Sequence, residues 1–323
     1  MRASLACAER VAVFLALSLA GLSCADAQEL SAILGAMRAD TPEASSFAWM
    51  ISYMEDIGTH FAASFSWQNE GHIPDHHRDG HSAQAWLRTQ AFSPHLVFAA
   101  GVGPYRYFDT TVAKSGGSHS DDHGYGVLYS LSAKWRGSGR WIYEARYNRV
   151  ETEKSIDTSE FILGIGYRLD KDRPEPDMGA AAPRRDELTA YIGRTIVNSF
   201  ESEQARAFSL EYRHAFTPSL RGSVAWLSEG DAALIKRNGI VAQAWYEPSF
   251  SGDRFTLGLG LGLYVATDDY REDREGAFPS GVITLSASYH LGREWLARFS
   301  WNRVTSNYDR DTDVLMLGAG YRF

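Results

Sequence analysis

The sequence ends in Asp313-Val-Leu-Met-Leu-Gly-Ala-Gly-Tyr-Arg-Phe323, and this stretch decides the fold class. From Leu315 onward apolar side chains occupy every second position, and methionine, glycine and arginine stand between them. Because successive side chains of a β-strand point to opposite faces, this alternation predicts a strand with apolar surroundings on one face only. Phe161-Ile-Leu-Gly-Ile-Gly-Tyr-Arg-Leu169 repeats the pattern in mid-chain.

Other segments also occur twice. Glu29-Leu-Ser-Ala-Ile-Leu-Gly35 returns as Glu187-Leu-Thr-Ala-Tyr-Ile-Gly193, and Ala83-Gln-Ala-Trp86 returns as Ala242-Gln-Ala-Trp245. The matches keep their order and nearly their spacing, which indicates a tandem duplication. Each copy divides into eight alternating segments of about ten residues, the length of a tilted strand that crosses a bilayer.

The terminal pattern resembles the C-terminal assembly signal of bacterial outer-membrane β-barrels. On this resemblance Tyr321 and Phe323 form the signal that the barrel assembly machinery reads. We therefore expect an all-β protein, an antiparallel transmembrane β-barrel in the cell outer membrane, surrounded by outer-membrane lipid and lipopolysaccharide. A soluble two-sheet sandwich is the alternative, but it would bury the apolar faces against each other and would not need a terminal phenylalanine.

The N-terminal segment carries the one long apolar run of the chain, Val11 to Leu22, followed by a small-x-small site at residues 25–27. This arrangement predicts a signal peptide that is cleaved after Ala27. Cys24 suggests lipidation instead, but Gly21 stands where a lipobox prefers leucine. Both cysteines of the chain lie in the removed segment, so the mature protein contains no thiol.

Composition excludes two further classes. A mean hydropathy of -0.29 over 323 residues excludes a bundle of membrane helices. The net charge of -8, with no basic stretch, excludes nucleic acid as a partner. The predicted domains are a signal peptide (1–27), a first eight-strand repeat (28–169), a periplasmic linker (170–186) and a second eight-strand repeat (187–323).

Connections between the predicted strands alternate in length. Short turns such as Gly137-Ser-Gly139 alternate with long loops at Asn69 to Gly80, Thr110 to His123 and Asp268 to Pro279. Short turns of outer-membrane barrels face the periplasm and long loops face outward. With an even number of strands, both termini are then expected in the periplasm.

The number of rings is open at this point. Sixteen strands in one ring would enclose a water-filled lumen, whereas two rings of eight would each be plugged by their own side chains. The linker and the inward glycines favour two rings. The rarity of two barrels in one chain, and the lack of a free C-terminus on the first copy, favour one. We expect the single 16-stranded ring in preference to two 8-stranded barrels.

Charged side chains on the inward faces are the candidate functional residues. They either line a pore, where they would bias which solute passes, or pair with one another and fill the barrel. The pore interpretation predicts a non-enzymatic outer-membrane channel or scaffold for small hydrophilic solutes or an exported polysaccharide. The residues are Arg88, Glu144, Arg146, Arg168, Glu211, Arg213, Glu229, Arg298 and Arg322.

Each copy also resembles the small eight-stranded barrels of the lipid A 3-O-deacylase type. It has a glycine-rich fifth strand, a Trp-Glu pair on the third strand and a Gly-Tyr-Arg ending. That family carries a His-x-Ser-Asn run late in the seventh strand, where this chain has Asn148-Arg-Val150 and Asn302-Arg-Val304. We expect no catalytic residue and no cofactor, and a lipid A-modifying enzyme, or an inactive relative, as the alternative function.

Histidines gather in the predicted loop between the third and fourth strands. His76, His77 and His81 are the candidate metal ligands, with His72 beside them. Their spacing matches no tight ligand pattern, and the equivalent loop of the second copy has no histidine. The expectation is therefore a solvated surface loop without a bound metal.

Overall fold

The computed structural model describes residues 25–90, 93, 95–113, 119–169, 184–250, 254–270 and 277–323. The predicted signal peptide lies outside these residues, apart from the backbone of residues 25–27, and so do both cysteines. The predicted linker lies outside them as well, apart from residues 184–186. In the described part, no helix is long and apolar enough to span a membrane.

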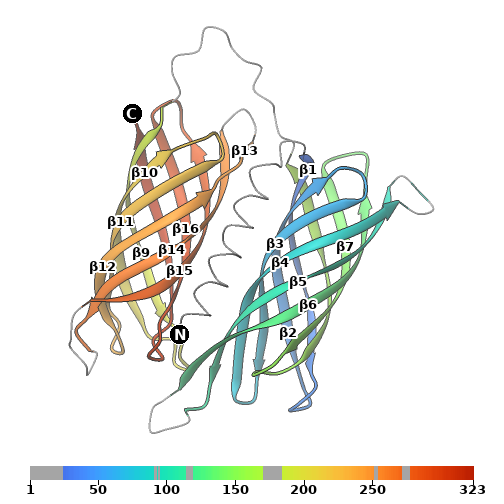
Figure 1. Cartoon of the computed structure of the whole chain (residues 1–323), viewed down its shortest axis with the longest axis horizontal. Helices are drawn as coiled ribbons and strands as arrows, with labels where there is room; N and C mark the ends of the chain where they lie inside the picture. The colour runs from blue at the N-terminus through green and yellow to red at the C-terminus, as the bar shows by residue number, and fades with distance from the viewer. Residues whose placement is uncertain are drawn as a thin grey trace, which may run out of the picture. The chain divides into compact units, whose positions relative to one another are not determined.

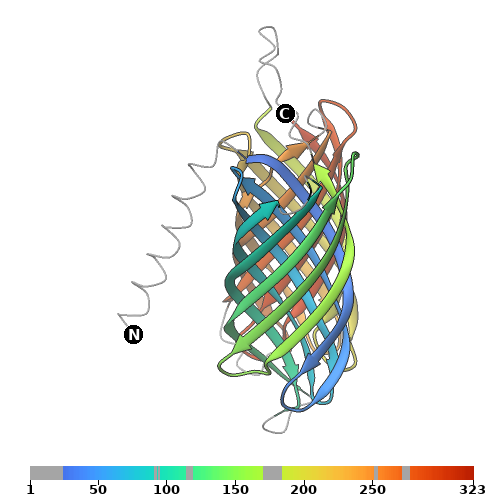
Figure 2. The same ribbon diagram turned by 90° about the vertical axis from the view of Figure 1, so that its right-hand side faces the viewer.

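Eight antiparallel strands of the first copy close into a barrel, because β1 pairs with both β2 and β8 (Figure 1). Its strands are β1 (Ala25–Ala39), β2 (Ala44–Ile57), β3 (Phe61–Ile73), β4 (His76–Gln90), β5 (Leu96–Thr111), β6 (Ser120–Arg136), β7 (Trp141–Thr152) and β8 (Thr158–Leu169). Figure 2 shows how strongly these strands tilt, as closure of so small a ring requires.

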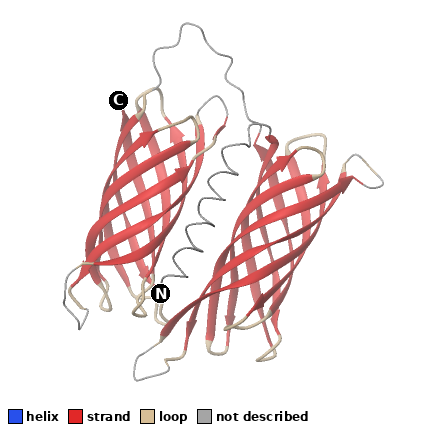
Figure 3. Ribbon diagram, in the orientation of Figure 1, coloured by secondary structure: helices blue, strands red, loops and turns tan. Residues whose placement is uncertain are grey.

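The second copy closes in the same way, through the pairs β9–β17 and β12–β14. Its strands are β9 (Asp186–Val197), β10 (Gln204–Ala215), β11 (Leu220–Asp231), β12 (Lys236–Tyr246), β13 (Ser249–Phe250), β14 (Phe255–Asp268), β15 (Phe278–His290), β16 (Trp295–Thr305) and β17 (Thr312–Arg322). The two-residue β13 is an addition beside β14 and takes no part in the closure. Figure 3 shows the described part as strands and loops.

The all-β barrel fold is confirmed, with two units of eight closing strands, but the preferred single ring of sixteen strands is not what forms. The first strand pairs with the eighth and the ninth with the last, which is the arrangement of two rings. Two equivalent glycines sit at these seams. A Cβ on Gly35 would lie 2.1 Å from the carbonyl oxygen of Phe161, and one on Gly193 would lie 2.1 Å from that of Leu315. Each copy thus carries the small residue that its own closure needs.

The two faces of the strands separate as the alternation predicts. On β17, Leu317 is 65% exposed on the outside and Met316 only 5% on the inside. Aromatic residues also lie on the outside: Trp141 is 54% exposed and Trp295 is 55% exposed. Apolar side chains therefore cover the outside of each barrel, whereas the inside is lined mainly by polar and small ones.

The predicted long loop at residues 69–80 is instead a continuation of the β3–β4 hairpin. The strands pair up to Ile73 and His76 around a tight turn, in which Asp75 adopts a positive φ of 66°. A bulge between Asn69 and His72 absorbs one shift of register. The extension still has a buried face, because Glu70 and Arg78 are buried inside the barrel whereas His72 is exposed.

The terminal residue completes the last seam of the second barrel. The Phe323 amide donates to the carbonyl oxygen of Asp186 at 2.9 Å, and the Asp186 amide donates back to Phe323 at 3.3 Å. The ring of Phe323 is 56% exposed on the outer face, with the Tyr321 ring centroid 6.5 Å away. The role of these two residues as an assembly signal stays a prediction.

Deletion of Phe323 should sharply reduce assembly, since it removes both the exposed aromatic ring and the last pair of seam hydrogen bonds. The measurement is the yield of the folded, heat-modifiable form on unheated gels. Deletion of Glu153, an exposed turn residue, serves as the control and should change little. Equal yields from the two deletions would contradict the assembly role.

Candidate functional site

The interior of the first barrel contains a buried ion pair near the end of the barrel where β3 meets β4. Arg78 donates to Glu70 at 2.5 and 2.7 Å, and both side chains are almost fully buried. The Tyr105 hydroxyl donates to the same carboxylate at 2.7 Å, and Thr158 contacts it from β8. We call these four residues the rim cluster of the first barrel; they tie β3, β4, β5 and β8 together.

The second barrel contains the same arrangement at equivalent positions. Arg237 donates to Glu229 at 2.7 Å and to Thr312 at 2.8 Å, and Thr312 donates to Glu229 at 2.6 Å. Tyr264 stands where Tyr105 does but donates to the backbone oxygen of Leu227 at 3.1 Å. Glu229, Arg237, Tyr264 and Thr312 form the rim cluster of the second barrel. Because both barrels contain the charged pair, it is a feature of the eight-strand unit.

Each barrel contains a tryptophan that is buried in its interior. Trp86 donates through its indole N–H to Ser64, and Trp245 donates to Ser223, each at 2.8 Å. An arginine lies over each ring as well. The guanidinium carbon of Arg146 is 5.0 Å from the Trp86 ring centroid, and that of Arg213 is 3.6 Å from the Trp245 centroid. A cation over an indole face, out of water, is an attractive contact.

Charges concentrate again toward the opposite end of the first barrel. Glu29 accepts from Lys134 at 2.8 Å and pairs with Arg136 at 2.6 Å. Arg146 pairs with Glu144 at 2.8 Å on the same strand. Arg88 pairs with Asp56. These side chains form the base cluster of the first barrel, in which every cation has a carboxylate partner.

The base cluster of the second barrel is built from different residues. Glu247 pairs with Arg213 at 2.6 Å and with Arg221 at 2.5 Å. Arg298 pairs with Glu187 and lies 3.5 Å from Glu247. Charges buried in a narrow barrel must be paired, since an uncompensated one is strongly destabilising.

Two positions carry opposite charges in the two copies. The strand position of Arg88 is taken by Glu247 in the second copy, and that of Glu144 by Arg298. Either difference alone would change the net charge inside the barrel. The two together leave the numbers of cations and carboxylates unchanged. The interiors are thus two separately balanced networks rather than copies of one.

The structure places the nine predicted inward charges in two groups. Arg88, Glu144, Arg146, Glu211, Arg213, Glu229 and Arg298 are buried inside the barrels. Arg168 and Arg322 are partly exposed and donate to backbone oxygens of turns, Gly139 at 2.5 Å and Gly292 at 3.2 Å. Their role as a pore lining stays a prediction.

Sequence reasoning missed several members of the clusters. Arg78 and Glu70 fell within a predicted loop, and Arg237 was assigned to the equivalent loop. The signal that could have found them is the repeated spacing: glutamate and arginine stand eight positions apart in both copies, as Glu70 with Arg78 and Glu229 with Arg237.

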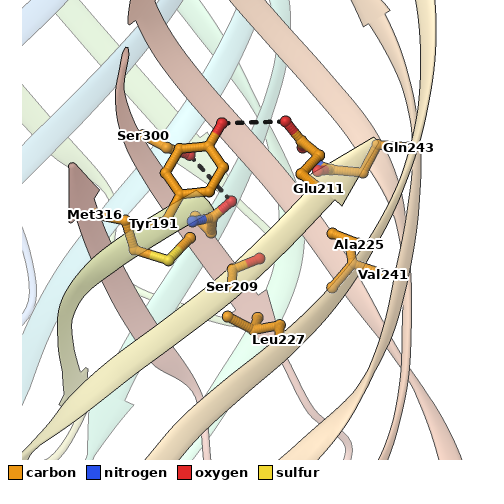
Figure 4. A pocket seen from close by; sticks show the side chains of 10 residues that line it. Tyr191, Ser209, Glu211, Ala225, Leu227, Val241, Gln243, Ser300 and Met316 are labelled. Carbon is orange, nitrogen blue, oxygen red and sulfur yellow. Dashed lines mark hydrogen bonds between the residues drawn. The ribbon is translucent and has the colours of Figure 1, made fainter. Parts of the chain in front are cut away.

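A small cavity lies inside the second barrel. It has a volume of about 10 Å³, which is room for roughly one water molecule. Figure 4 shows Tyr191 at its wall, with its hydroxyl donating to Glu211 at 3.1 Å. Ser209, Gln243, Ser300 and Met316 complete much of the lining. A cavity of this size could hold a bound water but no larger solute.

The positions that correspond to the deacylase motif serve structural contacts. Asn148 accepts from Ser130 at 2.7 Å and donates to Glu160 at 2.8 Å inside the first barrel. Asn302 donates to the backbone oxygen of Val314 at 3.1 Å in the second. An asparagine amide held in this way provides neither the base nor the nucleophile of acyl transfer.

The predicted metal ligands lie along β4. His77 stacks against its cross-strand partner His72 with ring centroids 3.8 Å apart. His81 contacts the Trp67 ring instead, at 4.4 Å between centroids. Among the described residues, no group of three or more histidine, cysteine, aspartate or glutamate side chains could hold a metal ion.

Comparisons with known proteins gave structural neighbours only. No protein-family model matches the chain, and no curated protein does. Among solved structures, the N-terminal β-barrel domain of Pseudomonas aeruginosa OprF is 11% identical, with a TM-score of 0.37 over 45% of this chain and 98% of that one. Neisserial surface protein A is 18% identical, with a TM-score of 0.34 over 44% and 96%. The CymD monoaromatic hydrocarbon channel is 9% identical, with a TM-score of 0.25 over 94% and 90%.

Proposed function

We propose that the protein is a non-enzymatic scaffold of the bacterial outer membrane, built from two closed barrels with filled interiors. The support for the membrane location comes from the outer faces. Leu34, Leu163, Leu317 and Ile192 are each more than half exposed, and aromatic rings such as Trp141 accompany them. An apolar outside with aromatic residues at its borders is the pattern of strands that face lipid.

The mature chain should fractionate with the outer membrane and resist extraction by salt or alkali. Its exposed apolar side chains would lose their lipid contacts if it left the bilayer. Immunoblots of outer-membrane and periplasmic fractions measure this directly. Recovery of the protein in the soluble periplasmic fraction would contradict the proposal. Both termini are proposed to face the periplasm, which a protease-accessible tag at either end would test.

The scaffold part of the proposal rests on one observation, the filled interior. Each barrel contains a rim cluster, a buried tryptophan and a base cluster, and these contacts join strands that lie apart in sequence. Glu187 and Arg298, for example, bridge β9 and β16, and Gln68 on β3 donates to Glu160 on β8 at 3.0 Å. A solute would have to break several of these buried contacts to pass.

Refolded protein in planar bilayers should therefore show no steady conductance steps. Ion flow needs a continuous column of water, and the side chains occupy the space that such a column would need. A variant with Trp245→Gly and Arg213→Gly, which removes the buried indole and the guanidinium over it from the second barrel, provides the comparison and should leak ions. Reproducible steps from the unaltered protein would instead support a channel for small hydrophilic solutes or an exported polysaccharide.

A further inference from the structure

Two arginines stand side by side on the lipid-facing surface of the second barrel. Arg194 on β9 and Arg206 on β10 are direct cross-strand partners, and both are exposed. Like charges at directly opposed positions of a sheet destabilise it unless something compensates them. The first copy has Ala36 and Phe47 at the equivalent pair, so barrel closure alone does not require the arginines.

The arginines have no acidic partner in the described part of the chain. Arg194 donates to the neutral side chain of Gln204 at 2.7 Å. The neighbouring carboxylate of Asp313 is already held by Arg303, with two contacts of 2.8 Å. Among the described residues neither Arg194 nor Arg206 enters an ion pair, so the positive charge of the pair is left for an external anion.

The strand pairings place the two arginines at the border of the apolar surface. Across the sheet, Arg194 is next to Leu315, and Leu315 is next to Trp301. Trp301 shares the outer face of β16 with Trp295 and Phe299, and its indole N–H donates to Asp313 at 2.8 Å. Such tryptophans mark the level of lipid headgroups. This border lies near the β9–β10 turn, which faces outward if both termini are periplasmic.

Directly beside the arginines, the same two strands present a pair of apolar side chains. Ile192 and Phe208 are cross-strand partners, and they are 59% and 44% exposed. This arrangement suits one lipid molecule, because the two arginines can bind its headgroup and the two apolar side chains can contact its acyl chain. Guanidinium groups suit this task because their planar fork binds phosphate oxygens bidentately.

We propose that Arg194 and Arg206 bind a phosphate group of lipopolysaccharide in the outer leaflet, with its acyl chains against Ile192 and Phe208. The inference rests on the proposed outer-membrane location and orientation, and it names a specific lipid partner. Phosphate between the two guanidinium groups would remove the repulsion of the pair and supply each with a charged acceptor.

Purified lipopolysaccharide titrated onto detergent-refolded protein tests the site, with dephosphorylated lipopolysaccharide and phosphatidylglycerol as comparison ligands. The double variant Arg194→Gln/Arg206→Gln should bind phosphorylated lipopolysaccharide about tenfold more weakly or worse, since it loses contacts between charged groups. Dephosphorylated lipopolysaccharide should bind the unaltered protein as weakly as phosphorylated lipopolysaccharide binds the double variant. Phosphatidylglycerol, which has one phosphate and no sugar backbone, should bind less tightly than lipopolysaccharide.

The matched control is Arg38→Gln/Arg149→Gln in the first barrel. It makes the same change of charge, but these arginines already have carboxylate partners, Glu43 and Asp40. The control should bind lipopolysaccharide like the unaltered protein, and Arg194→Lys/Arg206→Lys should keep part of the affinity. Heat-modifiability on gels verifies that each variant is folded.

Equal affinity of the glutamine variant and the unaltered protein would overturn the site, and so would indifference to removal of the lipid phosphates. Equally tight binding of phosphatidylglycerol would overturn the assignment to lipopolysaccharide. Because binding is measured on refolded protein and location by cell fractionation, failure of this site is distinguishable from failure of the outer-membrane proposal.

Discussion

Cysteines placed across the closing seam of each barrel should oxidise almost completely to disulfides. Leu34 and Leu163 are partners across β1 and β8, and Ile192 and Leu317 are partners across β9 and β17. All four side chains lie on the outer face, so replacing them disturbs no buried contact. Directly opposed strand residues have Cα atoms about 4.5–5.5 Å apart, which is within disulfide range.

The decisive comparison is Leu163→Cys/Ile192→Cys, which joins β8 to β9. A ring of sixteen strands would make these strands neighbours, whereas two rings leave this pair unlinked. The chain from residue 28 onward contains no cysteine, so every disulfide must come from the introduced pair. Gel mobility with and without reductant measures the linked fraction. Efficient linkage of β8 to β9, with none between β1 and β8, would contradict the two closed rings.

Much of the fold could be predicted because the polarity pattern of each strand is contained in its own residues. Alternation along residues 161–169 and 313–323 predicts which side chains face outward, and the repeat predicts that both halves do the same. These predictions hold because they depend on each strand alone. The number of rings depends on whether the first strand pairs with the eighth or with the last. The alternation along each strand is the same for one ring and for two. The seam glycines Gly35 and Gly193 became informative only once their carbonyl neighbours were known.

The clusters inside the barrels were only partly predictable, for a related reason. Parity along a strand correctly places Glu144 and Arg298 inside, but it does not reveal partners on other strands. Lys134, for instance, reaches Glu29 across the sequence from β6 to β1. Such pairs follow from strand tilt and stagger, which only the closed ring defines. Arg78 and Glu70 were missed because the hairpin continues beyond the apolar part of its strands.

The second large effect is expected at the rim cluster of the second barrel. Arg237→Ala should lower the free energy of unfolding by about 3–5 kcal/mol, the usual cost of leaving one member of a buried ion pair alone. Glu229 would remain fully buried, with Thr312 as its hydroxyl partner. The double variant Glu229→Gln/Arg237→Met should lose much less free energy of unfolding than Arg237→Ala, since it removes both charges of the pair.

Urea unfolding of refolded protein in detergent, followed by tryptophan fluorescence, measures these differences. Lys236→Gln is the matched control. Lys236 precedes Arg237 in the chain but is exposed, and its ion pair with exposed Asp269 is 3.5 Å long. Exposed pairs contribute at most about 1 kcal/mol. Arg78→Ala should repeat the effect in the first barrel, and the two losses should add, because each ion pair lies inside its own closed ring. If Arg237→Ala unfolded at the same urea concentration as Lys236→Gln, the buried pair would not be holding the barrel together, and the filled interior would no longer explain a closed lumen.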